Sequence, residues 1–224
     1  MSTSAPEPLP PRLPGPLRVV LDSCVFPRRT WMDPILDSAR AGHIRLFWSP
    51  SIISEVNRLL TWLWLENHGG RLTDASWRQC SLTAKAWFGH MTRVFHVVED
   101  CPPHESPWTL VPRDEDDAPI WTTAVRARAH VVITENLKDG PPANDEGLHL
   151  YQGILYVHPN DFCHLLPWLG DLNETGVDWK LGEDDLGETA AATASSRTTP
   201  VQPPPELWSA IRDLLLRTEQ DTSL

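Results

Sequence analysis

The chain has 224 residues, 41% of them hydrophobic, and a net charge of −11. This length allows one domain with a substantial core plus extensions, and the negative charge argues against a protein that coats nucleic acid. The apolar runs are too short and too polar to span a membrane. The four cysteines form no CxxC pair, and no secretion signal begins the chain. We therefore expect no zinc site, reduced thiols and a cytoplasmic location.

Composition divides the chain into four parts. Residues 1–16 form a Pro-rich tail, and residues 17–169 carry the regular patterns of a folded domain. Residues 170–205 have the composition of a linker, and seven acids and one base lie between residues 171 and 190. Residues 206–224 hold a short amphipathic pattern that predicts a C-terminal helix.

Strands and helices alternate along the central part. The first predicted strand, residues 18–21, precedes a helix over 33–40, for which Asp33 is the expected N-cap and Pro34 the first residue. The further predicted strands cover 44–48, 95–98, 130–134 and 153–157, and the further helices cover 50–66, 74–93, 118–129 and 159–169. This order predicts an α/β domain with a mostly parallel sheet covered on both faces. No glycine-rich nucleotide fingerprint follows any strand.

Acidic and amide side chains follow several of these strands. Asp22 ends the first strand, Glu55 lies in the first turns after the second, and Asp117 directly precedes the helix that leads into the strand 130–134. Asn136 and Asp139 follow that strand. In a parallel sheet these positions can meet at one edge. Oxygen ligands without Cys or His favour Mg²⁺ or Mn²⁺, and such ions support hydrolysis of a phosphodiester.

Each of these signals also has a structural explanation. Asp22 could be a turn former or a helix N-cap, and Asp117 is a credible N-cap. Glu55 could be a surface acid on the border of the helix, the run from Asp114 to Asp117 a solvated loop, and Asn136 a turn residue. The order and spacing of the set carry the argument for a metal site.

Three segments of the sequence, VVLDSCVF, SPSIISEVNR and DEDDAPIWTTAVRARAHVVITENLKD, together resemble a PIN-domain nuclease. The similarity covers roughly residues 17–166 and is greatest to the VapC-like toxins of bacterial toxin–antitoxin pairs. It implies a three-layer α/β/α sandwich with a central, mostly parallel five-stranded sheet. It also implies a Mg²⁺ or Mn²⁺ cofactor and cleavage of RNA.

The resemblance assigns expected roles to individual residues. Asp22, Glu55 and Asp117 match the metal-binding acids, and Asp116 takes the third position if the register shifts by one residue. The fourth acid of many PIN domains falls at Asn136, with Asp139 shortly after it; this is a departure, because an amide carries no charge. Ser23 and Thr134 match polar positions that help to orient the site.

The same resemblance suggests partners. The predicted helical hairpin of residues 50–93 corresponds to the region where homodimers form and a cognate antitoxin protein binds. Trp62, Trp64, Trp77 and Trp87 would suit such a groove, although tryptophans are equally at home in a core. Four arginines near the site in sequence order are candidates for contact with RNA phosphates: Arg28, Arg29, Arg58 and Arg126.

The sequence thus predicts a metal-dependent endoribonuclease, the toxin of a toxin–antitoxin pair, that cleaves RNA with a metal-activated water. The alternative is a catalytically weak or inactive PIN scaffold that binds RNA or a partner protein, which the neutral Asn136 favours. A third hypothesis is a phosphatase with Asp22 as nucleophile. Ser23-Cys24 follows Asp22 where such enzymes usually carry DxD, which counts against it.

Overall fold

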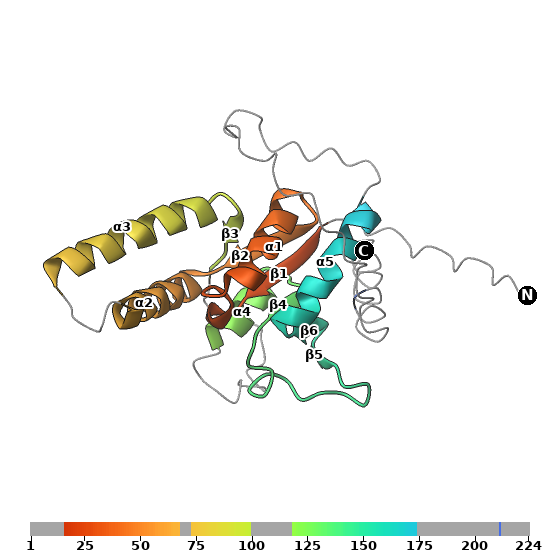
Figure 1. Ribbon diagram of the computed structural model, residues 1–224. Coiled ribbons are helices and arrows are strands. Elements are labelled where there is room, and N and C mark those ends of the chain that lie inside the picture. Colours follow the sequence, from red (N-terminus) through yellow and green to blue (C-terminus); the bar gives the residue numbers. More distant parts are fainter. Residues whose placement is uncertain (1–15, 68–72, 100–117, 174–210, 212–224) are drawn as a thin grey trace, which may run out of the picture.

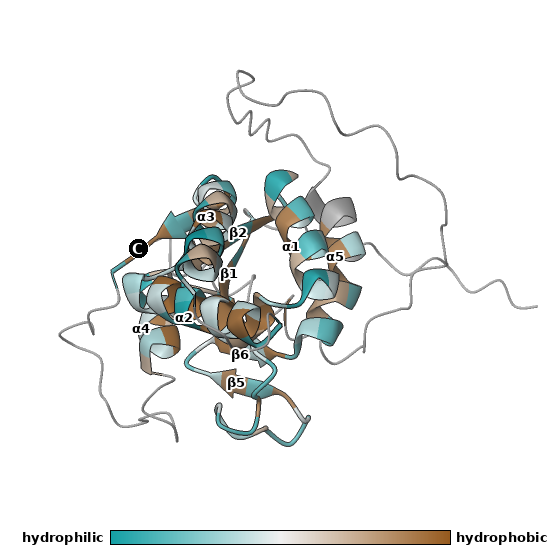
Figure 2. Ribbon diagram, turned by 60° about the vertical axis from the view of Figure 1, so that its left-hand side comes forward, coloured by the Kyte–Doolittle hydropathy of each residue, from teal (hydrophilic) through white to brown (hydrophobic). Residues whose placement is uncertain are grey.

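The computed structural model describes residues 16–67, 73–99, 118–173 and Ile211. A sheet forms the middle layer between two layers of helices (Figures 1 and 2). Helices α1 (Arg29–Arg40) and α5 (Pro159–Asn173) pack together on one face. Helix α4 (Ala118–Arg126) covers the other face, next to α2 (Pro50–Asn67). The predicted α/β/α sandwich is confirmed.

The described part of the sheet has six strands rather than five. Their order is β3-β2-β1-β4-β6-β5, and all neighbouring pairs are parallel except β5 with β6. The strands are β1 (Leu17–Leu21), β2 (Ile44–Trp48), β3 (Phe95–Val97), β4 (Val131–Ile133), β5 (His149–Tyr151) and β6 (Ile154–Val157). β1 lies inside the sheet, so its carboxyl end opens at the centre of one edge.

The strand missed by the sequence analysis is β5. A two-residue turn, Gln152-Gly153, joins it to β6, and both residues have positive φ angles of 48° and 77°. This is the geometry of a type I′ hairpin, for which Asn-Gly or Asp-Gly is the usual signal. The sequence does not predict this hairpin, because Gln stands at the first turn position and β5 has only three residues, all half-buried.

Helix α1 begins at Arg29, five residues before the predicted first residue Pro34. Arg28 is its N-cap residue, and Pro34 lies inside the helix instead of at its first position. The predicted cap at Asp33 is therefore wrong. Arg28 and the first turn of α1 instead follow directly on the 3-10 helix η1 (Ser23–Val25), which places them near the end of β1.

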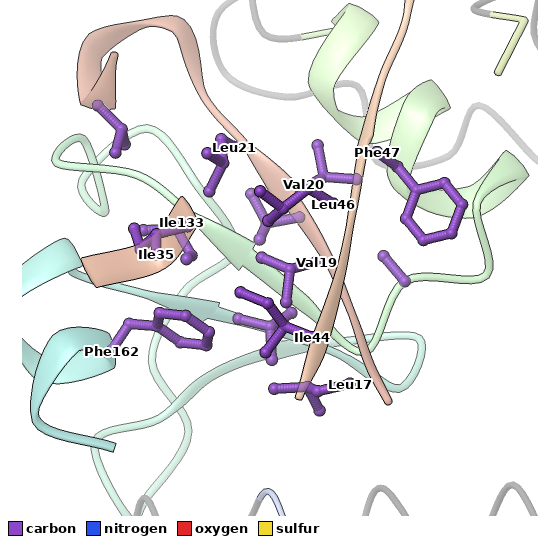
Figure 3. Packing of buried hydrophobic residues seen from close by; sticks show 14 of the residues in the cluster. Leu17, Val19, Val20, Leu21, Ile35, Ile44, Leu46, Phe47, Ile133 and Phe162 are labelled. Carbon is purple, nitrogen blue, oxygen red and sulfur yellow. The ribbon is translucent and has the colours of Figure 1, made fainter. Parts of the chain in front are cut away.

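Aliphatic side chains from the central strands fill both interfaces of the sheet. Val20 and Phe47 point toward α4, whereas Leu21 and Ile133 point toward Ile35 of α1 (Figure 3). All four strand residues are at most 6% exposed. Burial on both faces explains why apolar residues follow one another directly in residues 19–21, 46–48 and 131–133.

The hairpin of α2 and α3 (Asp74–Met91) projects from the body (Figure 1). Thr73 caps α3 through a reciprocal capping box with Ser76. The base of the hairpin is anchored by aromatic packing, in which Trp87 contacts Phe26 and Phe88. Trp87 is thus partly buried and packs against the core, whereas Trp62 and Trp77 are 54% and 52% exposed.

Several predictions fall on residues that the structure does not describe. Among them are most of the tail 1–16, the linker beyond residue 173, and the C-terminal helix 206–224 apart from Ile211, which is helical and buried in the core cluster. Helix α5 continues to Asn173, past the predicted end at Leu169. In the part of the chain that is described, no helix is both long and apolar enough to cross a bilayer.

Candidate metal and nuclease site

Asp22 lies where β1 leaves the sheet. Its backbone amide still donates to Ile133 O on β4 at 2.9 Å, and its side chain is only 8% exposed. Three buried aliphatic residues before it fix the end of the strand inside the sheet. The carboxylate is therefore held at the carboxyl edge, where parallel sheets place their ligand sites.

The side chain of Asp22 does not cap a helix. It precedes η1 but makes no capping hydrogen bond. Its Oδ2 atom accepts hydrogen bonds from Thr134 Oγ1 at 2.6 Å and from Cys24 Sγ at 3.2 Å. The capping explanation offered by the sequence is therefore wrong for this residue.

Glu55 reaches the same place from α2. The helix starts after Ser49, whose hydroxyl accepts from Ile52 N at 3.4 Å, and it buries Ile52 and Val56. This orientation turns Glu55 toward η1. Ser23 Oγ lies 2.8 Å from Glu55 Oε1 and 3.4 Å from Asp22 Oδ1, so one hydroxyl bridges the two carboxylates. We call Asp22, Ser23, Cys24, Glu55 and Thr134 the carboxylate site.

The described hydrogen-bond donors to the two acids of the carboxylate site are neutral groups, namely the hydroxyls of Ser23 and Thr134 and the thiol of Cys24. The ion pairs among described residues are Arg28–Glu135 and Arg40–Asp37, and neither involves Asp22 or Glu55. Burial, and secondly the charge of Asp22, raises the pKa of the Cys24 thiol to about 12. The thiol is therefore a neutral donor at physiological pH. Two adjacent carboxylates without a cation fit a hard divalent metal such as Mg²⁺ or Mn²⁺.

The third predicted ligand lies outside the described residues. Asp117, and Asp116 as the alternative in a shifted register, immediately precede Ala118, the first residue of α4. Within the described ranges, no three His, Cys, Asp or Glu side chains lie close enough together to hold a metal ion. Among the described residues the site therefore contains two acids, Asp22 and Glu55.

Asn136 and Asp139 form a separate pair beside the site. Asn136 Nδ2 donates to Asp139 Oδ2, and Asn136 N donates to Thr134 Oγ1 at 2.9 Å. Thr134 thus accepts from the loop and donates to Asp22. The Asn136 amide is occupied by Asp139, and the loop acts on Asp22 through the Thr134 hydroxyl.

Of the four arginines named from the sequence, Arg28 is connected to the carboxylate site through Glu135. Its guanidinium pairs with Glu135 at 3.1 Å and lies 5.1 Å from the centroid of the Trp31 ring. Glu135 N in turn lies 3.4 Å from Cys24 Sγ. Arg29 and Arg58 are exposed on α1 and α2, and Arg126 is exposed near the end of α4, which lies at the opposite edge of the sheet.

Sequence reasoning missed Cys24 and Glu135. The sequence assigns Cys24 no role in the site, although it follows Asp22 by two residues and the 3-10 turn folds its thiol back onto that carboxylate. Glu135 stands between two residues that were named. In both cases proximity in sequence to Asp22 and Thr134 was the available signal.

Comparison with known families agrees with this arrangement. A family model of the PIN domain matches residues 18–138, more than half of the chain. The chain belongs to the PIN-domain family. No relative was found among curated proteins. PIN domains are in general nucleases that use divalent metals, so the family implies a nucleic-acid substrate for this PIN domain as well.

A groove of about 370 Å³ lies between α2 and α3 of the PIN domain. Asn57 and Thr61 line it from α2, and Trp77, Cys80 and Phe88 line it from α3. Leu82, 62% exposed, lies on the same hairpin. Glu55 is not part of this lining, so the groove and the carboxylate site use different faces of α2.

Proposed function

We propose that this PIN domain is a Mg²⁺- or Mn²⁺-dependent endoribonuclease. The observation that carries the proposal is the Ser23 hydroxyl, which joins Asp22 at the end of β1 to Glu55 on α2, while neither acid forms an ion pair with another residue of the described ranges. Like-charged carboxylates placed close together at a strand end repel one another and destabilise a fold, unless a bound ligand neutralises their charge. Divalent metal is the ligand that both the donor atoms and the family favour.

Asp22 and Glu55, with Asp117 as the third acid, would hold the metal. A bound divalent ion would supply charge neutralisation at the phosphate and an activated water for hydrolysis. Thr134 and Cys24 orient Asp22 through its Oδ2 atom, and Ser23 sets the spacing of the two carboxylates. Arg28, at the rim of the site, would contact a substrate phosphate.

The test is cleavage of a labelled single-stranded RNA with Mn²⁺ by the full chain and by Asp22→Asn and Asp117→Asn. Both variants should lose cleavage while keeping the circular dichroism of the parent. Asp37→Asn is the matched control, because this exposed acid on α1 pairs with Arg40 and lies outside the carboxylate site. Full activity of either site variant, or undiminished activity in EDTA, would refute the mechanism.

The proposal extends to a toxin of a toxin–antitoxin pair, acting on RNA in the cytoplasm. The α2–α3 groove, which Trp77 lines, and the exposed Trp62 and Leu82 on the same hairpin offer apolar surface for a cognate antitoxin or a second copy of the chain. Induced expression should arrest growth of a bacterial host, and Asp22→Asn should relieve the arrest. Sedimentation of the pure protein with Trp77→Ser as the variant tests the homodimer.

The second candidate is a PIN scaffold with weak or no catalysis. It is favoured by Asn136, whose amide is bound to Asp139 where many PIN domains have a fourth acid. Calorimetry with Mn²⁺ separates the two candidates. Micromolar to millimolar binding that disappears in Asp22→Asn supports the enzyme, and no heat of binding in the parent protein supports the scaffold.

A further inference from the structure

Three arginines and a histidine gather at the edge of the sheet opposite to the carboxylate site. Arg18 and Arg45 are register partners on β1 and β2, so their side chains share one face of the sheet. His96 on β3 is the register partner of Phe47, and Arg128 follows the end of α4. We call Arg18, Arg45, His96 and Arg128 the amino-edge patch.

Contacts hold Arg18 in place without neutralising it. Its Nε donates to Ala127 O at 2.6 Å, and its guanidinium carbon lies 4.5 Å from the centroid of the Phe47 ring. Neither partner is a carboxylate, and neither Arg18 nor Arg128 takes part in the ion pairs among described residues. The positive charges therefore act on one another: burial first, then Arg45 and Arg128, lower the pKa of Arg18. Burial, then Arg45 and Arg18, likewise lower the pKa of His96.

The backbone at Arg128 is adverse for an arginine. Ala129 N donates to Ala124 O at 2.8 Å and Arg128 N donates to Val125 O at 3.0 Å, the two bonds of a Schellman motif. Arg128 occupies the position after the C-cap with φ 47°, where glycine is the usual residue. A strained, exposed arginine is thus kept beside two others of the same charge.

Helix α4 connects this patch to the other edge of the sheet. Because it returns from β3 to the start of β4, α4 begins at the carboxyl edge and ends at the amino edge. Its nine residues span about 13 Å. Exposed Arg126 lies near its last turn. A polymer with a repeating negative charge could therefore contact the patch and the carboxylate site in the same complex.

We propose that the amino-edge patch binds the phosphate backbone of single-stranded nucleic acid, outside the segment that occupies the carboxylate site. Guanidinium groups bind phosphate oxygens in a planar, two-point geometry. Backbone contacts are independent of base sequence, so they supply affinity and register rather than sequence specificity. The inference rests on the nucleic-acid substrate of the PIN family and does not depend on hydrolysis.

Binding of a fluorescent 12-nucleotide RNA, followed by anisotropy in EDTA at several KCl concentrations, tests the patch. Arg128→Gly is the first variant, because glycine removes the guanidinium and relieves the backbone; it should unfold at the same or a higher urea concentration. Arg18→Gln/Arg128→Gly should weaken binding about tenfold at low salt and reduce the slope of log K against log salt by about 1.4. The double variant should lose as much affinity for single-stranded DNA of the same sequence as it loses for the RNA.

Arg40→Gln is the matched control. Arg40 ends α1 at the same edge of the sheet, on the opposite face, and its loss should leave the affinity unchanged. Equal affinities for the double variant and this control would overturn the proposal. Displacement of the RNA by inorganic phosphate at constant ionic strength would also overturn it, because the ligand would then be the free ion.

The other candidate occupant is the acidic segment 171–190 of the chain itself. If that segment filled the patch, the double variant would bind RNA as the parent does, and trypsin would cut faster after Lys180. This pair of results would reject nucleic acid in favour of the segment. RNA binding by the amino-edge patch is measured without metal. Absence of RNA cleavage with Mn²⁺ would therefore refute the proposed hydrolysis without affecting the proposal that the patch binds RNA.

Discussion

Ser23 Oγ lies 2.8 Å from Glu55 Oε1, which makes the first residue after Asp22 the link between a strand end and a helix 32 positions later in the chain. The same hydroxyl lies 3.4 Å from Asp22 Oδ1. One proton therefore serves two carboxylates, and the distance between the two acids depends on this small side chain.

Ser23→Ala should lower the free energy of unfolding in EDTA by about 1 kcal/mol, because two neighbouring carboxylates lose their common donor. Mn²⁺ should restore more stability to this variant than to the parent, since a cation replaces the missing donor. Urea unfolding with EDTA or Mn²⁺ measures both effects. Ser54→Ala, an exposed serine on the same helix as Glu55, is the control and should show neither. Equal behaviour of the two variants would contradict the bridging role.

Thr134→Val should cost more stability than Thr134→Ser, about 2 kcal/mol against about 1 kcal/mol. Valine keeps the shape but leaves Asp22 Oδ2 without its 2.6 Å donor and Asn136 N without its acceptor. Serine keeps both bonds and loses one methyl group. Thermal or urea unfolding of the three proteins gives the order. A valine variant as stable as the parent would mean that the hydroxyl does not hold Asp22.

The sheet was the most predictable part of the molecule. Apolar runs such as residues 19–21 and 46–48 are buried on both faces, and this pattern is typical of the inner strands of parallel sheets. The places where the structure departs from local sequence preferences share one cause. Pro34 inside α1, Gln152 in a type I′ turn and Arg128 in a glycine position are residues that local preference would place elsewhere, and tertiary packing decides their conformation.

The carboxylate site was predictable in its acids but not in its connections. The order Asp22, Glu55, Asp117 follows from strand ends and from the family resemblance. That the Ser23, Cys24 and Thr134 side chains all donate to these acids depends on the 3-10 turn after β1 and on the register of β1 with β4. No periodicity in the sequence encodes those two features. The amino-edge patch likewise emerges only once β1, β2, β3 and the end of α4 are adjacent.

Glu135→Gln should strengthen the binding of single-stranded RNA by a few-fold, because Glu135 and a phosphate compete for Arg28. The ion pair is largely exposed, so its loss should change stability by less than about 1 kcal/mol. Anisotropy in EDTA gives the affinity. Asp37→Asn removes the equivalent pair with Arg40 on α1 and is the control, with no expected change. Unchanged or weaker binding by Glu135→Gln would argue against contact of Arg28 with substrate.

His130 should make the fold sensitive to mild acid. Burial, and secondly Arg18, lowers the pKa of this imidazole to about 4, and its Nδ1 atom accepts a hydrogen bond from Arg18 N at 3.1 Å. In the unfolded chain His130 takes up a proton near pH 6.5. As the pH falls from about 6.5 to about 4, the unfolded state binds the proton first, and stability declines by up to about 3 kcal/mol. Above pH 6.5 this contribution is complete.

His130→Asn keeps an acceptor for Arg18 N and removes the titration. Urea unfolding at intervals between pH 7.5 and pH 4.5 should therefore show a smaller loss of stability for this variant than for the parent, with the two curves diverging below pH 6.5. His164→Asn, an exposed histidine on α5, controls for the general effect of acid and should follow the parent. Parallel curves for parent and His130→Asn would mean that His130 is protonated equally in the folded and unfolded states.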